Sequence, residues 1–344
     1  MRIKGLDVLR GIAILLVIYR HGILESNPVK EFGWIGVDLF FVISGFLVSG
    51  IIFKEYLKSG TVNIKRFFMR RGFKIYPSFY FFMLFSIVFH WFHTQTFYDW
   101  HLVLAEAFYF QNYTDGIWYH TWSLDVEEHF YIVLALFALV AMRTKILFRR
   151  RTMVISLLLL LVISFILRFQ ASWPHRNEGP LFIVKTHLRS DGLIIGVLLS
   201  YIMLFTDGDK WIIGKEKIVF IAALILMIPG FCFKGGGFVM NTAGLTLTNI
   251  GFGLITAVSL KPLSIAPTLY KTIKTPVNIL SYIGQNSYCI YLWHLSVLVA
   301  VNYVFNYSRP INFCMYLMLS LFIGILMTYV IEKPFLRWRE KVSP

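Results

Sequence analysis

The sequence predicts an all-α integral membrane protein, and its composition and its apolar runs support that prediction. Hydrophobic residues make up 57% of the 344 residues and charged residues only 15%, whereas a typical soluble domain has about 25% charged residues. The mean hydropathy is +0.67. Apolar runs close to the length of a membrane-spanning helix recur along the whole chain. We therefore expect a polytopic transmembrane helical bundle.

The apolar runs give about ten spans separated by short connections. In chain order they cover residues 6–24, 33–53, 75–93, 122–142, 152–170, 187–205, 217–233, 240–260, 281–305 and 311–331. A further apolar segment, Trp100–Tyr113, is too short to cross the bilayer and contains Glu106. We expect a short interfacial or re-entrant helix there. Tyr76-Pro77 and Glu332-Lys-Pro334 are interpreted as structural devices at inner helix ends.

The distribution of Lys and Arg orients these spans. If the N-terminus is cytoplasmic, the inner segments carry 23 Lys and Arg residues and the outer segments carry five. This asymmetry is what the positive-inside rule requires, so we expect both termini in the cytoplasm. The net charge of +15 is then mainly topological, and we expect no nucleic-acid partner. We further expect one membrane domain over residues 1–344 with no appended soluble domain.

Arg10 and His21 lie eleven residues apart within the first predicted span. On a helix this spacing places both side chains on one stripe, about 16 Å apart along the axis. Ionisable side chains inside a membrane are costly, so retained ones are candidates for function. The structural alternative is a salt bridge between Asp7 and Arg10 near the membrane surface, with His21 as an ordinary histidine at the outer end.

The depth of the other polar residues predicts two layers. Counted from the outer ends of their spans, five groups lie within about 5–8 Å of the outer boundary: His21, Asp38, Glu127, Glu128 and Asp191. Four groups form the corresponding inner layer: Arg10, Lys74, Asn286 and Glu332. The structural alternative is that several spans each keep one polar residue near a water-facing end by chance. No metal site is indicated, because Cys232, Cys289 and Cys314 fall in or beside apolar spans.

Seven short motifs occur in order between residues 6 and 335. They are Leu9-Arg10-Gly11 with His21, Gly36-Val-Asp38 through Ser44-Gly45, Arg70-Arg71-Gly-Phe-Lys74-Ile-Tyr76-Pro77, Trp122-Ser-Leu-Asp-Val-Glu127-Glu128-His129-Phe-Tyr131, Arg189-Ser-Asp191-Gly192, Ser287 through Trp293-His294, and Ile331-Glu332-Lys-Pro334. Together they resemble the acyltransferase-3 family, which comprises integral-membrane, acyl-CoA-dependent O-acyltransferases of bacterial surface polysaccharides. The resemblance implies a ten-span bundle that delivers an acyl group from cytoplasmic acyl-CoA to a glycan hydroxyl.

Carried over onto this chain, the family's motifs assign functional residues and show two departures. The Arg-x10-His motif falls on Arg10 and His21, and the family's glutamate falls on Glu127. The family's usual Arg-x-x-Arg reads Arg-x-x-Lys74 here, and lysine lacks the bidentate fork of arginine. The usual glutamine after the paired glutamates is replaced by His129, which we expect to face a neighbouring helix, the alternative being that its titratable ring alters the local proton balance.

Acyl transfer to a hydroxyl requires a base for the hydroxyl proton and donors for the oxyanion. A neutral histidine suits the first task, so His21 is the candidate base, with Glu127 or Asp38 as the carboxylate that orients its imidazole. Arg10 completes the predicted catalytic set and would guide the donor's arm or its terminal phosphates. Acylation of His21 itself, followed by relay of the group, is an open alternative.

The remaining predictions concern ligands. The basic segment after residue 64 suits the phosphates of acyl-CoA, or alternatively faces lipid headgroups; the donor-binding set is Arg66, Arg70, Arg71, Lys74 and Tyr76. The predicted acceptor-binding set is Ser44, Trp122, Glu128, Asp191 and His294. Ser44 and His294 have the alternative of helix packing, and Trp122 that of an ordinary aromatic belt. No tightly bound cofactor is expected beyond acyl-CoA, here a donor substrate and most simply acetyl-CoA.

The sequence thus predicts a multi-pass enzyme of the bacterial inner membrane that acylates an extracytoplasmic or cell-surface glycan. The alternative is a transporter or flippase of a glycan or small molecule without covalent chemistry. Transporters tend to show paired halves with matching broken helices, and no such symmetry is evident in this sequence. The acceptor, the acyl chain and the oligomeric state stay open at this point.

Overall fold

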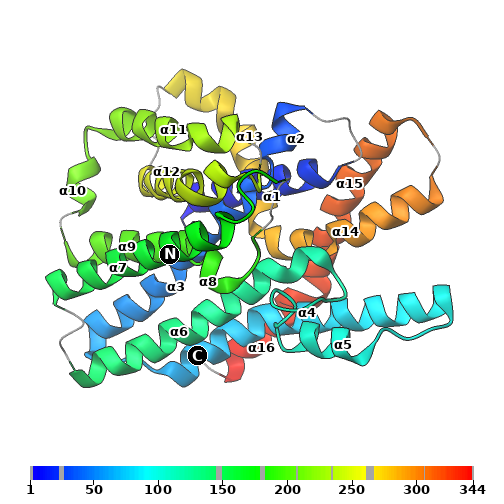
Figure 1. Ribbon diagram of the computed structural model, residues 1–344, viewed down its shortest axis with the longest axis horizontal. Coiled ribbons are helices and arrows are strands. Elements are labelled where there is room, and N and C mark those ends of the chain that lie inside the picture. Colours follow the sequence, from blue (N-terminus) through cyan, green and yellow to red (C-terminus); the bar gives the residue numbers. More distant parts are fainter. Residues whose placement is uncertain are drawn as a thin grey trace.

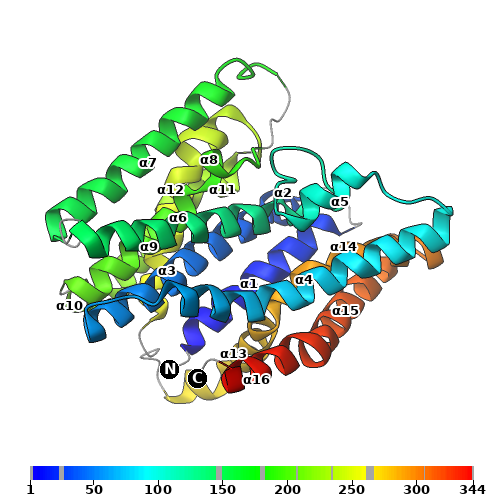
Figure 2. The same ribbon diagram turned by 90° about the horizontal axis from the view of Figure 1, so that it is seen from below.

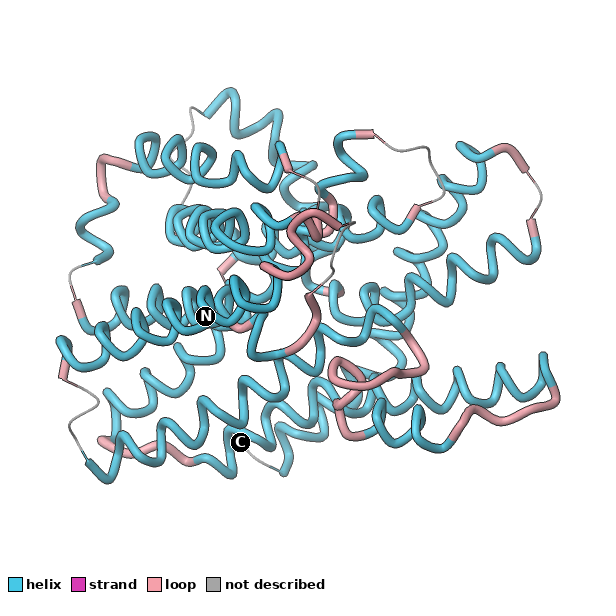
Figure 3. Tube along the Cα trace, viewed as in Figure 1, coloured by secondary structure: helices cyan, strands magenta, loops and turns pink. Residues whose placement is uncertain are grey.

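The computed structural model describes residues 3–22, 27–144, 149–178, 183–206, 208–233, 235–260, 267–305 and 307–342, and every regular element among them is helical. The helices are α1 Lys4–His21, α2 Pro28–Phe32, α3 Ile35–Ser59, α4 Ile64–Thr94, α5 Trp100–Ala107, η1 Tyr119–Thr121, α6 Trp122–Thr144, α7 Arg150–Ser172, α8 Thr186–Arg189, α9 Asp191–Phe205, α10 Gly208–Ile212, α11 Glu216–Cys232, η2 Met240–Gly244, α12 Leu245–Ser259, α13 Pro267–Gln285, α14 Ser287–Val304, α15 Arg309–Met327, η3 Thr328–Glu332 and α16 Lys333–Val342. Figure 3 shows helix throughout the described part, joined by short loops. The predicted all-α class is confirmed.

Six helical segments among the described residues are long and apolar enough to cross a membrane. They are Val29–Ser59, Ile64–Thr94, Arg150–Ser172, Met240–Ser259, Ser287–Val304 and Arg309–Val342. The helix Asp191–Phe205 is also apolar but shorter. The chain is therefore a multi-pass helical membrane protein, while the predicted count of ten spans stays a prediction. The interfacial segment contains the eight-residue helix α5, too short to span a bilayer.

The basic segment is part of a helix, which corrects the sequence interpretation of residues 54–74 as a loop. Gly60 ends α3 in the left-handed conformation, at a φ of 69°, which glycine adopts without strain. The Asn63 side chain then accepts a hydrogen bond from the Arg66 backbone N–H at 2.9 Å and caps α4. Helix α4 consequently begins eleven residues before the predicted span at residue 75, and Pro77 lies inside it rather than at its end.

A second correction concerns the predicted span 281–305. The structure divides it at Asn286, between the end of α13 and the start of α14. The first half of helix α13 was not predicted because Lys271, Lys274 and Pro276 interrupt the apolar pattern there. Glycine lets α13 lie directly on α1: a side chain at Gly284 would collide with the backbone carbonyl of Asp7.

The helices are inclined to one another, and the chain ends lie toward one end of the bundle (Figures 1 and 2). Both marked termini lie in the left half of each view, the half that contains α10, whereas the connection between α14 and α15 lies at the right. Helix α3 packs along α9, α11 along α12, and α14 along α15. Small residues permit the α3–α9 contact, because a side chain at Gly45 would collide with the backbone of Leu193.

Candidate functional site

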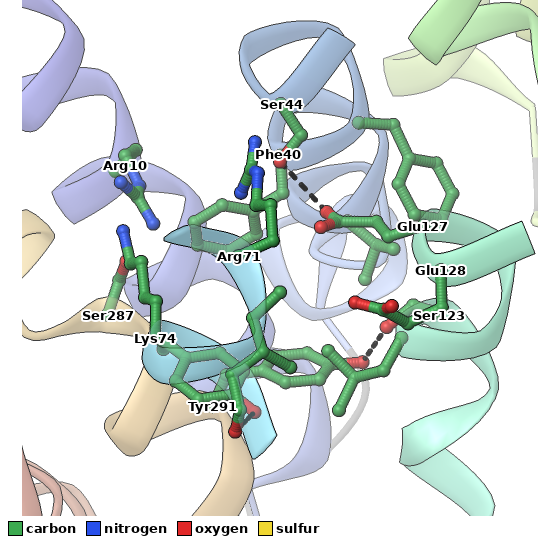
Figure 4. A pocket seen from close by; sticks show the side chains of 15 residues that line it. Arg10, Phe40, Ser44, Arg71, Lys74, Ser123, Glu127, Glu128, Ser287 and Tyr291 are labelled. Atoms are coloured by element: carbon green, nitrogen blue, oxygen red, sulfur yellow. Dashed lines mark hydrogen bonds between the residues drawn. The ribbon is translucent and has the colours of Figure 1, made fainter. Parts of the chain in front are cut away.

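A small cavity lined by both polar and apolar side chains lies where α1, α3, α4, α6 and α14 meet. Its volume is about 70 Å³. Figure 4 shows its polar side chains: Arg10, Ser44, Arg71, Lys74, Ser123, Glu127, Glu128, Ser287 and Tyr291. These residues come from widely separated parts of the sequence. The fold therefore brings several of the predicted site residues into one place.

Cations and carboxylates face each other across this central cavity. Arg10 from α1 and Arg71 and Lys74 from α4 lie on one side, and Glu127 and Glu128 from α6 lie on the other (Figure 4). No ion pair within 4.0 Å joins these three cations to the two carboxylates, all of which lie in the described part of the chain. Their charges thus face the cavity rather than neutralising each other in direct contact.

Glu127 is held by two hydroxyl groups. Ser44 donates a hydrogen bond to its Oε1 at 2.9 Å, and Tyr131 donates one to its Oε2 at 2.5 Å. The guanidinium of Arg71 lies over the Tyr131 ring, 4.5 Å from its centroid, in a cation–π arrangement. One oxygen of this carboxylate is therefore oriented by α3 and the other by the next turn of α6 itself. Ser44 lines the cavity, whereas the neighbouring Gly45 permits close helix packing.

Only one carboxylate oxygen of Glu128 has a hydrogen-bond donor among the described residues, in contrast to Glu127. Tyr76 donates a hydrogen bond to its Oε2 at 3.1 Å, while its buried Oε1 has no hydrogen-bond partner among the described residues. A buried carboxylate oxygen without a partner is costly in a folded protein. Because Glu128 lines the central cavity, this oxygen is available to a ligand hydroxyl or a water there.

A larger cavity of about 700 Å³ adjoins the central one and shares Arg10, Ser44, Arg71 and Lys74 with it. Its basic lining consists of Arg10, Lys54, Arg70, Arg71, Lys74 and Arg339. Two acidic residues, Asp7 and Glu340, also line it. This basic cavity is in the size range of small-molecule and cofactor sites. Its lining suits a polyanionic ligand.

Two cations of the basic cavity were not predicted from the sequence. Lys54 is near the end of α3, and Arg339 belongs to α16, which follows the last predicted span. Helix α16 is held against α4 by an edge-to-face contact between Trp338 and Phe73, with ring centroids 5.4 Å apart. The alternation of basic and aromatic residues in 333–342 is the signal that could have indicated an amphipathic helix at the membrane surface.

His21 lies outside both cavities, at the last residue of α1. Its Nδ1 is 3.0 Å from the Val17 carbonyl oxygen and 3.3 Å from Nε2 of His294. Neither Glu127 nor Asp38 hydrogen-bonds it in the described structure. The predicted carboxylate partner of His21 is therefore absent from this arrangement, and a second histidine occupies that position.

The two predicted layers also need correction. Glu127 and Glu128 lie with Arg10 and Lys74 in the central cavity instead of sharing a separate layer with His21. Counting residues from the end of a helix gives depth only when the helices are parallel and their ends are level. Figure 2 shows α1, α6 and α7 inclined to one another, so equal counts correspond to different depths.

Asp38 and Asp191 belong to two buried ion pairs rather than to the cavity. Arg189 donates to Asp38 at 2.8 Å, and Arg168 contacts Asp191 at 2.7 Å. The Arg189 guanidinium also lies 5.3 Å from the Trp122 ring centroid. These contacts join α3, α7, α8 and α9 beside the cavity.

The remaining predicted ligand residues are spread over the neighbourhood. Arg70 lines the basic cavity, whereas Arg66 lines neither cavity. Tyr76 reaches the site through Glu128. His129 faces a neighbouring element as predicted, since its Nδ1 is 2.7 Å from the Thr186 hydroxyl. The described residues contain no cluster of three or more His, Cys, Asp or Glu side chains that could hold a metal ion.

Comparison with known proteins identifies the family. A family model described as an acyltransferase domain matches residues 3–329. The chain belongs to the acyltransferase-3 family. No solved structure matches it with significance.

Two Staphylococcus aureus proteins illustrate the relationship. SACOL0978 of strain COL is 27% identical over 380 aligned residues, covering 99% of this chain and 60% of that protein. The O-acetyltransferase OatA of strain NCTC 8325 / PS 47 is 26% identical over 321 aligned residues, covering 87% of this chain and 51% of OatA. The chain thus spans 60% or less of the length of these relatives.

Proposed function

We propose that this protein is a membrane O-acyltransferase that transfers an acyl group, most simply acetyl, from acyl-CoA to a hydroxyl of an extracytoplasmic or cell-surface glycan. The observation that carries the proposal is the junction of the two cavities. A large basic cavity shares Arg10, Ser44, Arg71 and Lys74 with a smaller cavity that contains two glutamates. Membership of the acyltransferase-3 family and the O-acetyltransferase relatives support the same chemistry.

The donor nucleotide would bind in the basic cavity. Its cations suit phosphate oxygens, and Arg70, Arg71 and Arg339 can form charge-assisted hydrogen bonds of the bidentate kind. Lys74 keeps a positive charge at the junction but contacts a phosphate as a point charge. The pantetheine arm would then pass Arg10 and Ser44 into the central cavity, where the thioester comes close to the glutamates.

The acceptor would approach from the side of His21. In this conformation the rings of Phe40 and Tyr291, with centroids 6.4 Å apart, form part of the wall of the central cavity. His294 does not line the cavity, and its ring packs against that of Tyr291 with centroids 5.5 Å apart. Transfer therefore requires this wall to open, so that the thioester carbon and the acceptor hydroxyl meet beside His21.

The reaction is balanced without any further reagent. The acceptor oxygen forms a C–O bond to the acyl carbon while its proton passes to the imidazole of His21. The C–S bond breaks, and the leaving thiolate takes that proton to give free CoA. Arg10 and Arg71, which line the central cavity, hold the arm of the donor during the transfer. The variant in which His21 carries the acyl group as a covalent intermediate uses the same residues.

We also propose ten spans with both termini in the cytoplasm of an inner-membrane protein. The excess of Lys and Arg on the predicted inner segments supports this orientation. The position of both termini toward one end of the bundle agrees with it (Figures 1 and 2). Reporter fusions within residues 65–71 should then give a cytoplasmic signal and fusions within 112–118 an external one. The opposite pattern would reject the orientation.

The test of the function uses purified protein in liposomes supplied with acetyl-CoA and a panel of glycans. We expect release of free CoA thiol together with an acetyl-sized mass increase on one glycan. The His21→Ala variant should lower that rate by about 10²- to 10⁴-fold, as is typical for loss of a general base. Trapping an acetyl group on His21 by rapid quench and mass spectrometry would select the covalent variant.

A cellular assay distinguishes transfer from transport. In cells that carry His21→Ala, we expect the glycan at the surface without its acyl group. Loss of the glycan itself from the surface would favour the transporter or flippase alternative. Unchanged acylation in the variant would remove His21 from the mechanism.

A further inference from the structure

Among the described residues, His294 is the one hydrogen-bond partner of His21 that belongs to another helix. It lies on α14, is fully buried, and is 273 residues away from His21 in the chain. The two imidazole rings are 5.1 Å apart between centroids, and the nearest nitrogens are 3.3 Å apart. The contact therefore joins the outer end of α1 to the middle of α14.

The hydrogen bonds of His294 fix where its proton is. Its Nδ1 is 2.5 Å from the carbonyl oxygen of Tyr291, one turn earlier on the same helix. A carbonyl oxygen can only accept, so Nδ1 of His294 carries the proton. A neutral imidazole has one N–H, and Nε2 of His294 is consequently an acceptor pointed at His21.

The same reasoning shows which ring nitrogen of His21 carries the proton. Its Nδ1 faces two acceptors, the Val17 carbonyl oxygen at 3.0 Å and Nε2 of His294 at 3.3 Å. Both contacts require a proton on Nδ1, which donates to them in a shared hydrogen bond. The Nε2 of His21 is then the unprotonated nitrogen, and no group in the described part of the chain hydrogen-bonds it.

We propose that His294 is a positioning residue that holds His21 as the Nδ1–H tautomer and aims its basic Nε2 at the reacting hydroxyl. This proposal rests on the proposed function, in which His21 is the base. It gives His294 the place that a carboxylate has in many acid–base pairs. A neutral acceptor provides the orientation without adding a further buried charge at the end of α1.

The chain offers a matched control in His120. This histidine is also buried, and its ring centroid lies 5.0 Å from that of His294. Its Nε2 contacts the Leu292 carbonyl oxygen at 3.1 Å, and it has no hydrogen bond to His21. Replacing His120 removes a packed ring from the same neighbourhood and leaves the His21–His294 contact in place.

The first experiment tests the tautomer directly and needs no substrate. Protein labelled with ¹⁵N-histidine is studied by solid-state NMR in liposomes, and His21 is assigned by the resonances lost in His21→Gln. We expect a protonated Nδ1 and an unprotonated Nε2 in the neutral ring, with a shift of the Nδ1 signal in His294→Leu. A protonated Nε2, or a spectrum of His21 unchanged by His294→Leu, would overturn the proposal.

The second experiment measures transfer from acetyl-CoA by the same variants. His294→Leu should lower kcat by about 10- to 100-fold, the usual effect of losing the partner that orients a functional histidine, with little change in KM for acetyl-CoA. His294→Gln should recover most of kcat, because its amide oxygen can accept the His21 Nδ1–H. His120→Leu should keep kcat near the wild-type value for equal amounts of folded protein.

The outcomes separate this proposal from the proposed function. If wild-type protein transfers no acyl group, the function fails and the NMR experiment alone decides the tautomer. If wild type is active and His294→Leu equals it, or His120→Leu is equally impaired at equal folded amounts, the positioning role is rejected. Failure of His294→Gln to exceed His294→Leu, with both folded, also rejects it.

Discussion

Two charged regions lie side by side in this protein, and they differ in whether their charges form ion pairs. In the first, Asp38 pairs with Arg189 and Asp191 with Arg168, each at 2.7–2.8 Å. In the second, the central cavity, three cations face two glutamates with no ion pair among these described residues. Charges that neutralise each other join helices, whereas charges kept apart around a cavity are available to a ligand.

The largest expected effect comes from breaking a buried ion pair. In Arg168→Leu the carboxylate of Asp191 loses its cation in a fully buried position. Breaking such a pair from one side costs about 3–5 kcal/mol. We expect little folded protein, measured as the monodisperse peak of a fluorescent fusion in detergent.

The double variant Arg168→Leu/Asp191→Leu sharpens the comparison. Replacing both members of a buried pair by apolar residues is often neutral for stability. We therefore expect the double variant to recover much of the folded protein and its transfer activity. A double variant that folds but transfers nothing would place Asp191 in the site, as the sequence analysis predicted, and would remove the distinction between the two regions.

In the central cavity we expect a substitution to lower activity without lowering the amount of folded protein. Glu127→Gln keeps the shape of the side chain and its contact with Ser44 but removes the negative charge that faces Arg10 and Arg71. We expect kcat to fall by about 100-fold, a magnitude typical of an acid–base or electrostatic group in an active site. The amount of folded protein should stay close to wild type. An equal loss of folded protein and activity would make Glu127 a structural residue like Asp38.

A smaller effect is expected at the basic cavity, where α16 offers a matched pair of variants. Arg339 lines that cavity, whereas Arg337 on the same helix is exposed and does not. Loss of one hydrogen bond to a charged group is worth about 1.5–3 kcal/mol when it is buried and less when partly exposed. Arg339→Gln should therefore raise KM for acetyl-CoA by roughly fivefold to tenfold, with kcat unchanged. Arg337→Gln should leave both constants alone, and equal effects of the two variants would indicate a general surface-charge effect.

The sequence contained enough to predict the class and part of the site. Apolar runs located α3 and α7 within a few residues, and the cost of intramembrane charge singled out Arg10, Lys74 and Glu127, which do meet. It did not reveal which charges pair, since pairing depends on helix tilt and rotation. Arg168, near the end of an apolar span, was itself a signal that a buried carboxylate should be sought.

Helix positions that depend on neighbours were also missed. The first half of helix α13 contains Lys and Pro, and the helix is positioned by close contact with α1, so hydropathy alone gave no indication of that half. Arg339 became part of the basic cavity only because Trp338 packs α16 against Phe73 of α4. The contact of His21 with His294 joins residues 273 positions apart, and no spacing rule along one helix could predict it.

The smallest expected effect tests whether an unpaired buried carboxylate is enough to mark a ligand site. Glu106 on the short helix α5 is buried away from the cavities and accepts a hydrogen bond from the Ile117 backbone N–H at 3.1 Å. Burial raises the pKa of Glu106 to about 7, against the opposing effect of its hydrogen bonds. A raised pKa in the folded state means that the neutral form is favoured there, so stability is lost as the pH rises through about 7.

We therefore expect the thermal unfolding midpoint of wild type to fall relative to that of Glu106→Gln between pH 6 and pH 8, because the amide stays neutral. The exposed Asp115→Asn, which removes a carboxylate with no ion pair among the described residues, is the control and should follow wild type over the same range. Transfer activity of Glu106→Gln at pH 6 should equal that of wild type. If Glu106→Gln lost activity while remaining folded, a buried carboxylate without a counter-charge would mark a functional residue even outside a cavity. The presence of a cavity would then no longer distinguish functional charges from structural ones.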